Sequence, residues 1–582
     1  MLQRFSKYAL LLVPFIPVAH ATAALPGQQN KQELDRLERQ TSQALIEEAK
    51  RTEQLIQQQK KMREAGDETL ASSDSNWKFQ VNHIVILDDT QFDNSPQRQA
   101  IIDRYEGKML GRTEIFELAK ELTDFYISRG YATTLIGVEP GNIKTGTLSL
   151  RVMWGKIHDL KVNGQAPSFR ERTRMFTAYP FAKDKILNMQ DVDQMVENLL
   201  RVYPNDNIEI QPSVINSYSD LNLLHVPAFP LSVTAGLNNS GFKADGWQQY
   251  YGSVTAKNIA GINDIFNVYY SWNNLKNNQD NQDSWSTSYS IPLGYWSFDA
   301  LYYKSSYDKT LAGNNASYAS DGDSDRASLR VSRMLGRNAT GKTSWWAKVE
   351  RRNSNNSIEN QRIDVSSKTY TSISSGATWV GALMNGWFYG DVGVTAAVPW
   401  FGSAWKNDAD LKGFDLDYVK YNGIASWTRP LFQSGRLGGV YELNAGFQYT
   451  PNVLVSDAKL TLGDEFTVRG FKDDSLLVDS GGWIANTLQF PFDVGVGGIY
   501  QLIPYVGYDL GFAKDNCPKG VNVCDSQFMM GGSVGIKATG SHFSTYVLAG
   551  WPIKNQIHWK RIPSITRSFI TRWKDRKSTR LN

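Results

Sequence analysis

Residues 436–449 read Arg-Leu-Gly-Gly-Val-Tyr-Glu-Leu-Asn-Ala-Gly-Phe-Gln-Tyr, with an apolar side chain or glycine at every odd-numbered position from Leu437 to Tyr449. The even-numbered positions are mostly polar or glycine. Residues 266–273 repeat the pattern, since Phe, Val, Tyr and Trp alternate there with Asn, Tyr, Ser and Asn. A period of two predicts β-strands that have one apolar face and one polar face.

The same alternation recurs from residue 229 to residue 574, in runs of roughly ten residues separated by turns. Apolar positions facing lipid and polar positions facing a wet interior are typical of an outer-membrane β-barrel. A soluble β-sandwich would also alternate, but it would place fewer of the 17 Trp and 27 Tyr near strand ends on the apolar face. We therefore predict an all-β transmembrane barrel of about sixteen antiparallel strands at 229–574.

Two units of similar order precede the barrel, at residues 77–155 and 156–228. The first combines a strand at 79–87, helices at 96 to about 109 and at 112–128, and strands at 132–138 and 147–154. The second combines a strand at 157–162, helices at 168–177 and 191–203, and strands at 207–211 and 220–226. Both have the order β-α-α-β-β, and such repeats are typical of binding or docking arrays.

The chain upstream of these units has three parts. Residues 1–21 have a charged start, a short apolar core and a small-residue cleavage site, which predict an export signal. Residues 28–65 are charged, rich in Gln and good helix formers, but their apolar positions are too sparse for a core-facing stripe. This helix is either a solvated tail or a polar plug lodged in a water-filled channel. Residues 66–76 are a linker.

One stretch of the predicted barrel, residues 451–480, does not alternate. Loops of this length are usually functional or disordered, and this one carries several apolar residues around Arg469. An apolar segment with one cation needs a protein interior to receive it and a carboxylate to pair with it.

Cys517 and Cys524 lie in one polar loop, and in an exported protein this spacing predicts a small disulfide. The six His are scattered without ligand spacing, so we expect no metal site and no cofactor. A net charge of +4 gives no nucleic-acid footprint. No catalytic Ser/His/Asp set, carboxylate pair or phosphate loop stands out, so we expect no enzyme. Residues 575–582 are basic, resemble a translated sequencing adapter and are expected to be non-native.

Together these features resemble the outer-membrane transporters of two-partner secretion, the TpsB or FhaC/ShlB/CdiB family of the BamA-like superfamily. Val468, Arg469, Gly470 and Phe471 match the family's lumenal loop motif, and Asp509 with Gly511 matches its barrel-wall motif. The resemblance implies an ion pair between Arg469 and Asp509. The alternate positions around Asp509 are apolar, so we expect its carboxylate to face the lumen, because a charge on the lipid face costs about 2 kcal/mol or more. It also implies that the two repeats are POTRA domains, which offer strand edges to an extended client.

The resemblance implies a periplasmic POTRA array that captures an unfolded TpsA-type exoprotein and a barrel that passes it to the cell surface. The exoprotein would be an adhesin, a haemolysin or a contact-dependent toxin, and the transporter would be a monomer in outer-membrane lipid. An assembly factor of the same superfamily is an alternative, although it would normally carry more POTRA units. A passive porin is a further alternative, but it would have no POTRA units.

Overall fold

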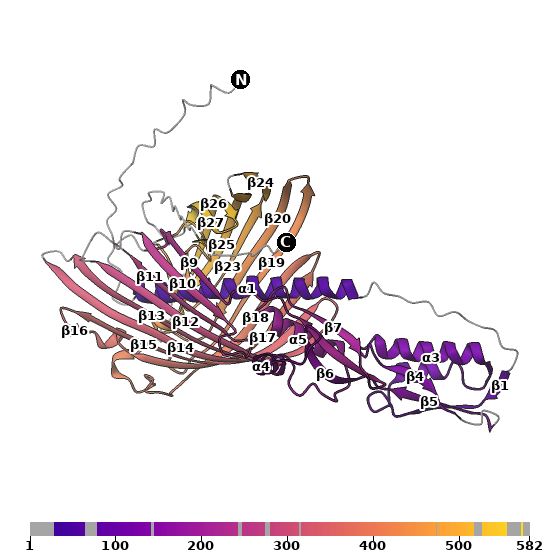
Figure 1. Cartoon of the computed structure of the whole chain (residues 1–582). Coiled ribbons are helices and arrows are strands. Elements are labelled where there is room, and N and C mark those ends of the chain that lie inside the picture. Colours follow the sequence, from indigo (N-terminus) through magenta and orange to yellow (C-terminus); the bar gives the residue numbers. More distant parts are fainter. Residues whose placement is uncertain are drawn as a thin grey trace, which may run out of the picture.

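The computed structural model describes residues 28–63, 78–140, 145–241, 247–273, 280–312, 316–472, 474–496, 498–516, 526–555 and 572–573. The predicted signal, the linker, Cys517, Cys524 and the terminal tail lie outside the described residues. Figure 1 shows a long helix, α1 (Gln28–Arg63), running along a β-barrel toward two smaller α+β units beyond one end of it. Among the helices that the structure describes, none is long and apolar enough to cross a membrane.

The barrel is a closed antiparallel sheet in which the last strand segment lies beside the first. Its segments are β9 (Leu231–Asn238), β10 (Gln249–Lys257), β11 (Ile265–Asn273), β12 (Asn281–Leu293), β13 (Trp296–Ala312), β14 (Ser317–Arg337), β15 (Gly341–Ile358), β16 (Gln361–Arg362), β17 (Thr369–Leu383), β18 (Gly386–Val398), β19 (Val419–Ser434), β20 (Leu437–Tyr449), β23 (Ser480–Gln489), β24 (Phe492–Val496), β25 (Ile499–Lys514), β26 (Ser526–Gly540), β27 (Phe543–Asn555) and β28 (Arg572–Trp573).

Two of these segments continue a neighbouring strand. Both β16 and β17 pair with β15, and both β23 and β24 pair with β20 and β25. Counted as interrupted strands, they leave sixteen barrel strands in the described part of the chain. The predicted fold class, a barrel of about sixteen strands behind two α+β domains and a helix, is confirmed.

The alternating pattern of the sequence determines which side chains of the barrel wall face outward and which face the lumen. On β25, Val506, Tyr508 and Phe512 are each more than 40% exposed, whereas Asp509 between them is fully buried. Apolar side chains thus lie on the outer surface, and polar side chains lie toward the lumen, as lipid outside and water inside require.

The first α+β unit contains two small sheets. One consists of β1 (Lys78–Val81) and β3 (Lys108–Gly111); in the other, β5 (Thr147–Met153) lies between β2 (His83–Leu87) and β4 (Leu135–Val138). Its helices are α2 (Pro96–Ile102) and α3 (Arg112–Ile127), and α3 buries Leu118, Leu122 and Tyr126. The parallel pairing of β2 with β5 is possible because helices connect them.

The second unit follows the same plan. The strand β8 (Tyr218–Leu224) lies between β6 (Lys156–Val162) and β7 (Asn207–Pro212). The helices α4 (Phe169–Ala178) and α5 (Met189–Leu200) cover this sheet. Met175, Met195 and Leu199 are almost fully buried between the helices and the sheet. The strand β8 leads directly toward the first barrel strand.

Several predicted boundaries are wrong. The helix predicted at 191–203 is α5 (Met189–Leu200) and the strand predicted at 132–138 is β4 (Leu135–Val138), and three further differences change the arrangement of elements. The strand predicted at 79–87 is divided at Asn82, because β1 pairs with β3 while β2 pairs with β5. The helix predicted to reach Met109 ends at Ile102, because the backbone amide of Gly107 donates to the Val81 carbonyl and returns the chain to β1. The stretch at 451–480 contains the 3₁₀ turn η5 (Ser456–Ala458) and a hairpin of β21 (Leu460–Leu462) with β22 (Leu476–Val478), and Ser480 begins β23. We call residues 450–479 the lumenal loop.

Candidate functional site: a lumen occupied by a helix and a loop

The first turns of α1 have a small apolar contact with the inner wall. Leu34 and Leu37 are almost fully buried against three tyrosines on β10, β11 and β13, which are Tyr251, Tyr269 and Tyr303. Burying two Leu side chains stabilises this position by about 3–6 kcal/mol in total. The sparse apolar positions that prevent α1 from serving as an ordinary core helix are sufficient to seat one end of it.

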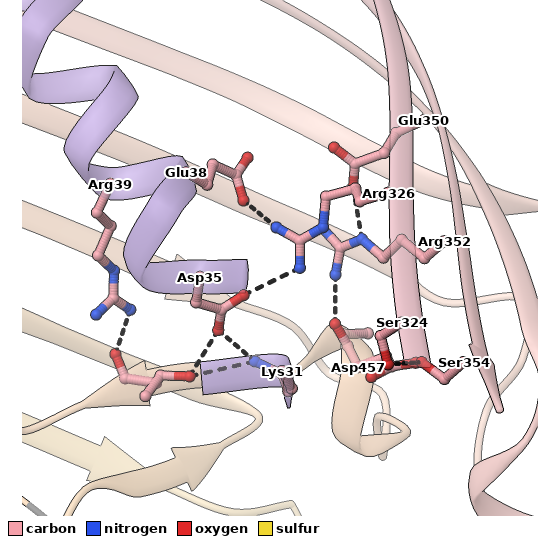
Figure 2. Close-up of polar contacts among 12 residues, drawn as sticks. Lys31, Asp35, Glu38, Arg39, Ser324, Arg326, Glu350, Arg352, Ser354 and Asp457 are labelled. Carbon is pink, nitrogen blue, oxygen red and sulfur yellow. Dashed lines mark hydrogen bonds and ion pairs between the residues drawn. The ribbon is translucent and has the colours of Figure 1, made fainter. Parts of the chain in front are cut away.

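Charged groups fix the other side of the same turns. Arg326 of β14 points from the wall toward α1, where its Nη2 lies 3.0 Å from Asp35 Oδ1 and its Nη1 pairs with Glu38 (Figure 2). The Arg326 side chain is 3% exposed, so its charge depends on these carboxylates. The ion pairs join residues that are about 290 positions apart in the sequence.

The wall around Arg326 carries a second arginine with its own partners. Arg352 Nε of β15 donates to Glu350 Oε1 at 2.5 Å, and its Nη1 donates to the backbone carbonyl of Asp457 (Figure 2). Asp457 belongs to η5 of the lumenal loop. Arg326 and Arg352 are therefore neighbouring basic residues of the wall, of which the first contacts the helix and the second contacts the loop.

The lumenal loop also contacts α1 directly. Lys31 Nζ donates to Thr461 Oγ1 at 3.2 Å, Gln32 Nε2 donates to Ser475 Oγ at 2.7 Å, and Arg39 pairs with Asp464. Each contact is polar, and each joins α1 to a loop residue more than 420 positions away. Helix and loop thus occupy the lumen as one hydrogen-bonded assembly.

Arg469 and Asp509 lie together on the far side of the loop. Arg469 Nη2 donates to Asp509 Oδ1 at 2.6 Å, and its Nε and backbone amide donate to Oδ2 at 2.7 and 2.9 Å. Asp509 is fully buried and Arg469 is 8% exposed. Three donors on one carboxylate make a strong, directional contact. The structure therefore brings these two predicted site residues together in the barrel wall.

The other four predicted motif residues lie around this pair. Val468 and Phe471 are buried in an apolar cluster with Leu462 and Met529. Gly470 has φ +97°, and a Cβ there would lie 2.4 Å from the Trp551 carbonyl carbon. A Cβ at Gly511 would lie 2.7 Å from Val468 Cγ2. The loop approaches β25 and β27 so closely that only glycine fits at these two positions.

A further ionic cluster connects α1, α5 and the wall at the end of the barrel next to the second unit. Arg337 Nη1 lies 3.3 Å from Glu53 Oε2 of α1, and its Nη2 pairs with Glu197 of α5. Lys342 also pairs with Glu197. Burial opposes the charge of Glu197, but Lys342 and Arg337 outweigh it and lower the pKa of Glu197 to about 2. Glu53 and Arg337 are essentially inaccessible to solvent.

The profile of the haemolysin secretion/activation protein family ShlB/FhaC/HecB matches residues 217–538, which is more than half of the 582 residues. The chain belongs to this family. The profile of the ShlB-type POTRA domain matches residues 79–155, and a second POTRA profile matches residues 156–212. The protein is an outer-membrane transporter of two-partner secretion, with its two POTRA units in the periplasm.

Individual relatives agree in length and fold. The outer membrane transporter CdiB of Dickeya dadantii is 26% identical over 94% of this chain and 96% of its own. The haemolysin transporter protein ShlB of Serratia marcescens is 26% identical over 72% of this chain and 73% of its own. The solved structure of CdiB from Escherichia coli has the same fold, with a TM-score of 0.81, 24% identity and coverage of 96% and 100% of the two chains.

Sequence reasoning missed most of the charged residues that hold α1. The alternation of β14 and β15 could assign their polar positions to the lumen, but it could not identify the partners. Arg326, Arg337 and Arg352 have no local motif, because each contact depends on the closure of the barrel around the helix. The Arg469–Asp509 contact was expected from the resemblance of these two motifs to those of the family. The residues alone indicated that the loop needed a carboxylate partner and that Asp509 faced the lumen.

Proposed function

We propose that α1 and the lumenal loop close the resting barrel and that both are displaced when an unfolded secreted protein passes through. The observation that carries this proposal is that Arg326, Asp35 and Glu38 fix α1 inside a sixteen-strand wall. A barrel of that size without an occupant would leave an aqueous channel. The two POTRA units would bind the client on the periplasmic side and present it to the lumen.

The composition of the contact favours a removable occupant. Leu34 and Leu37 contact the wall, and Ile56 with Leu55 packs into the core of the second unit. Otherwise α1 is held mainly by ion pairs and hydrogen bonds, which water can replace at a net cost of about 0.5–1.5 kcal/mol per hydrogen bond. A helix packed through a wide apolar stripe would instead expose that stripe to water on leaving. Polar contacts therefore hold α1 in a defined resting position from which a client protein could displace it.

The proposed client is a large exoprotein that arrives unfolded in the periplasm and folds at the cell surface. Adhesins, haemolysins and contact-dependent toxins are the candidate classes, and the name of ShlB associates that relative with haemolysin. We further propose that the protein acts as a monomer in outer-membrane lipid, by transport without catalysis.

The experiment is a reversible tether between α1 and the wall, made with Cys517 and Cys524 replaced by serine. Ser305 Oγ of β13 donates to Asn30 Oδ1 of α1 at 3.0 Å, so cysteines at these two positions can join helix and barrel. Oxidation should stop secretion of the client protein, and reduction should restore it. The matched control joins Ser324 to Ser354, which pair across β14 and β15 with their hydroxyl oxygens 3.0 Å apart.

The control tether also lies in the lumen but does not restrain α1, so it should leave secretion intact. Equal secretion with the Asn30–Ser305 tether closed would refute displacement of α1. Equal inhibition by both tethers would mean that stiffening of the wall, not retention of α1, blocks the path.

A further inference from the structure

The second POTRA unit has an unusual group of exposed aromatic side chains. Phe169 is 82% exposed, Phe181 is 76% exposed and Phe176 is 43% exposed. Phe169 and Phe176 lie two helical turns apart on one face of α4, and the ring of Phe176 meets that of Phe181 edge to face with centroids 5.2 Å apart. Phe side chains are normally buried, so a contiguous exposed group of three indicates a contact surface.

The neighbouring face of α4 is fixed to the barrel rim. Arg170 Nη2 donates to the Ile259 carbonyl at 3.1 Å, and Thr173 Oγ1 donates to the Gly261 carbonyl at 2.8 Å, both in the turn after β10. The Gly294 amide, in the turn between β12 and β13, donates to the Thr177 carbonyl at 2.8 Å. These contacts hold the aromatic group beside the β10–β11 and β12–β13 turns at the barrel rim.

The position of α4 relative to the pore axis is given by its neighbours. The helix α5 packs on both α1 and α4, so α5 lies between the helix in the lumen and α4. Figure 1 accordingly shows α4 at the lower edge of the barrel end, away from α1. The aromatic group therefore borders the rim of the barrel and not the entrance occupied by α1.

The lipid-facing belt of the barrel begins beside this contact. Trp296 and Phe298 of β13 are exposed on the outer face two and four residues after Gly294, and the Arg333 guanidinium carbon lies 5.1 Å from the centre of a Trp296 ring. Aromatic and basic residues of this kind mark the level of the lipid headgroups. The phenylalanines of α4 extend that belt onto the POTRA unit.

Charge around the three phenylalanines is mainly positive. Arg172 lies on the same face of α4 between Phe169 and Phe176, and Lys183 and Lys185 follow Phe181, with Asp184 as the exposed acidic residue among them. Basic side chains beside exposed aromatic rings favour binding to anionic lipid headgroups.

We propose that Phe169, Phe176 and Phe181 insert into the periplasmic leaflet of the outer membrane and that the adjacent basic residues bind anionic phospholipid headgroups. The insertion would fix the tilt of the second POTRA unit against the membrane while the first unit stays free in the periplasm. This inference depends on the outer-membrane location and not on displacement of α1, so it can fail independently of the proposed gating.

The test is photocrosslinking of the full-length protein in nanodiscs made from phosphatidylethanolamine and phosphatidylglycerol. The photoreactive amino acid p-benzoyl-phenylalanine replaces Phe169, Phe176 or Phe181 in turn, and lipid adducts are measured by mass spectrometry. Val214 is the matched control, because it is 94% exposed but lies in the β7–β8 turn, at the opposite end of β8 from the barrel. Phe298 on the outer wall is the positive control.

Lipid adducts at Phe169 and Phe181 should exceed those at Val214 by at least about tenfold, the partition factor expected for burying one Phe side chain. Yields equal to the Val214 background, with normal labelling at Phe298, would overturn the proposal. Crosslinks to a client protein in place of lipid would overturn it as well, because the surface would then face the transport path. Equal adduct yields in nanodiscs of phosphatidylcholine alone would overturn the anionic-headgroup part.

Discussion

Replacing Asp509 by asparagine should release the lumenal loop from the barrel wall. The asparagine side chain would keep the shape and one acceptor oxygen, but it would lack the negative charge that receives three hydrogen bonds from Arg469. Arg469 would then remain buried without a counter-charge. Removing one member of a buried ion pair typically costs about 3–5 kcal/mol, mainly because the other charge is left uncompensated.

The size of the effect can be read from one backbone amide. The Arg469 amide donates to Asp509 Oδ2 at 2.9 Å, so its hydrogen exchange reports how often the loop leaves the wall. A loss of 3–5 kcal/mol corresponds to a fall in protection of about 100- to 4,000-fold, provided the amide exchanges by this local opening. The measurement is hydrogen–deuterium exchange by mass spectrometry, resolved to the peptide that contains residues 468–471, on protein in nanodiscs.

The matched control removes both charges. The double substitution Arg469→Met with Asp509→Asn should retain most of the protection, because no buried charge is left uncompensated and the asparagine side-chain oxygen can still accept from the residue-469 amide. Protection in D509N within twofold of the wild-type value would refute the assignment of loop stability to this ion pair. A double variant as unprotected as D509N would show that the loss comes from packing.

Three further changes test the surrounding contacts. Gly470→Ala should expose the lumenal loop to trypsin, because the new Cβ would lie 2.4 Å from the Trp551 carbonyl carbon at a φ of +97°; resistance equal to wild type would contradict this. Glu197→Gln should increase hydrogen exchange in α5, because Arg337 loses a buried partner. Since the pKa of Glu197 falls from 4.5 to about 2 on folding, this contact should persist above about pH 4.5 and weaken as pH falls toward 2, and protection that is constant down to pH 2 would count against it. Arg326→Met should raise the open fraction of single channels by at least about tenfold, since a loss of 1.4 kcal/mol is enough for that factor, and an unchanged fraction would contradict the seating of α1 by this residue.

The barrel could be predicted from the sequence because the lipid and the wet lumen impose an alternation that reaches every strand. Residues 266–273 and 437–449 show it without reference to any distant contact. The face of Asp509 followed for the same reason. By contrast, the strand at 79–87 was predicted as one piece, because its apolar residues hide the change of partner at Asn82.

The role of α1 could not be predicted from its own residues. A polar helix with few apolar positions is equally compatible with a solvated tail and with a lumen. The role of Asp35 and Glu38 depends on their ion pairs with Arg326. Arg326 lies about 290 residues away in the sequence and faces these carboxylates only when the barrel closes. Contacts of this kind depend on the topology of the barrel, which cannot be read from local patterns in a single sequence.

The most direct test of a lumen closed by α1 is the single-channel conductance of the protein lacking residues 28–63, recorded in planar lipid bilayers. A folded barrel, verified by its heat-dependent mobility in gels, is the necessary control. The deletion should give large and long-lived openings, because a sixteen-strand barrel without its helix retains an aqueous path beside the loop. Conductance and open time identical to those of the full-length protein would show that α1 does not close the pore.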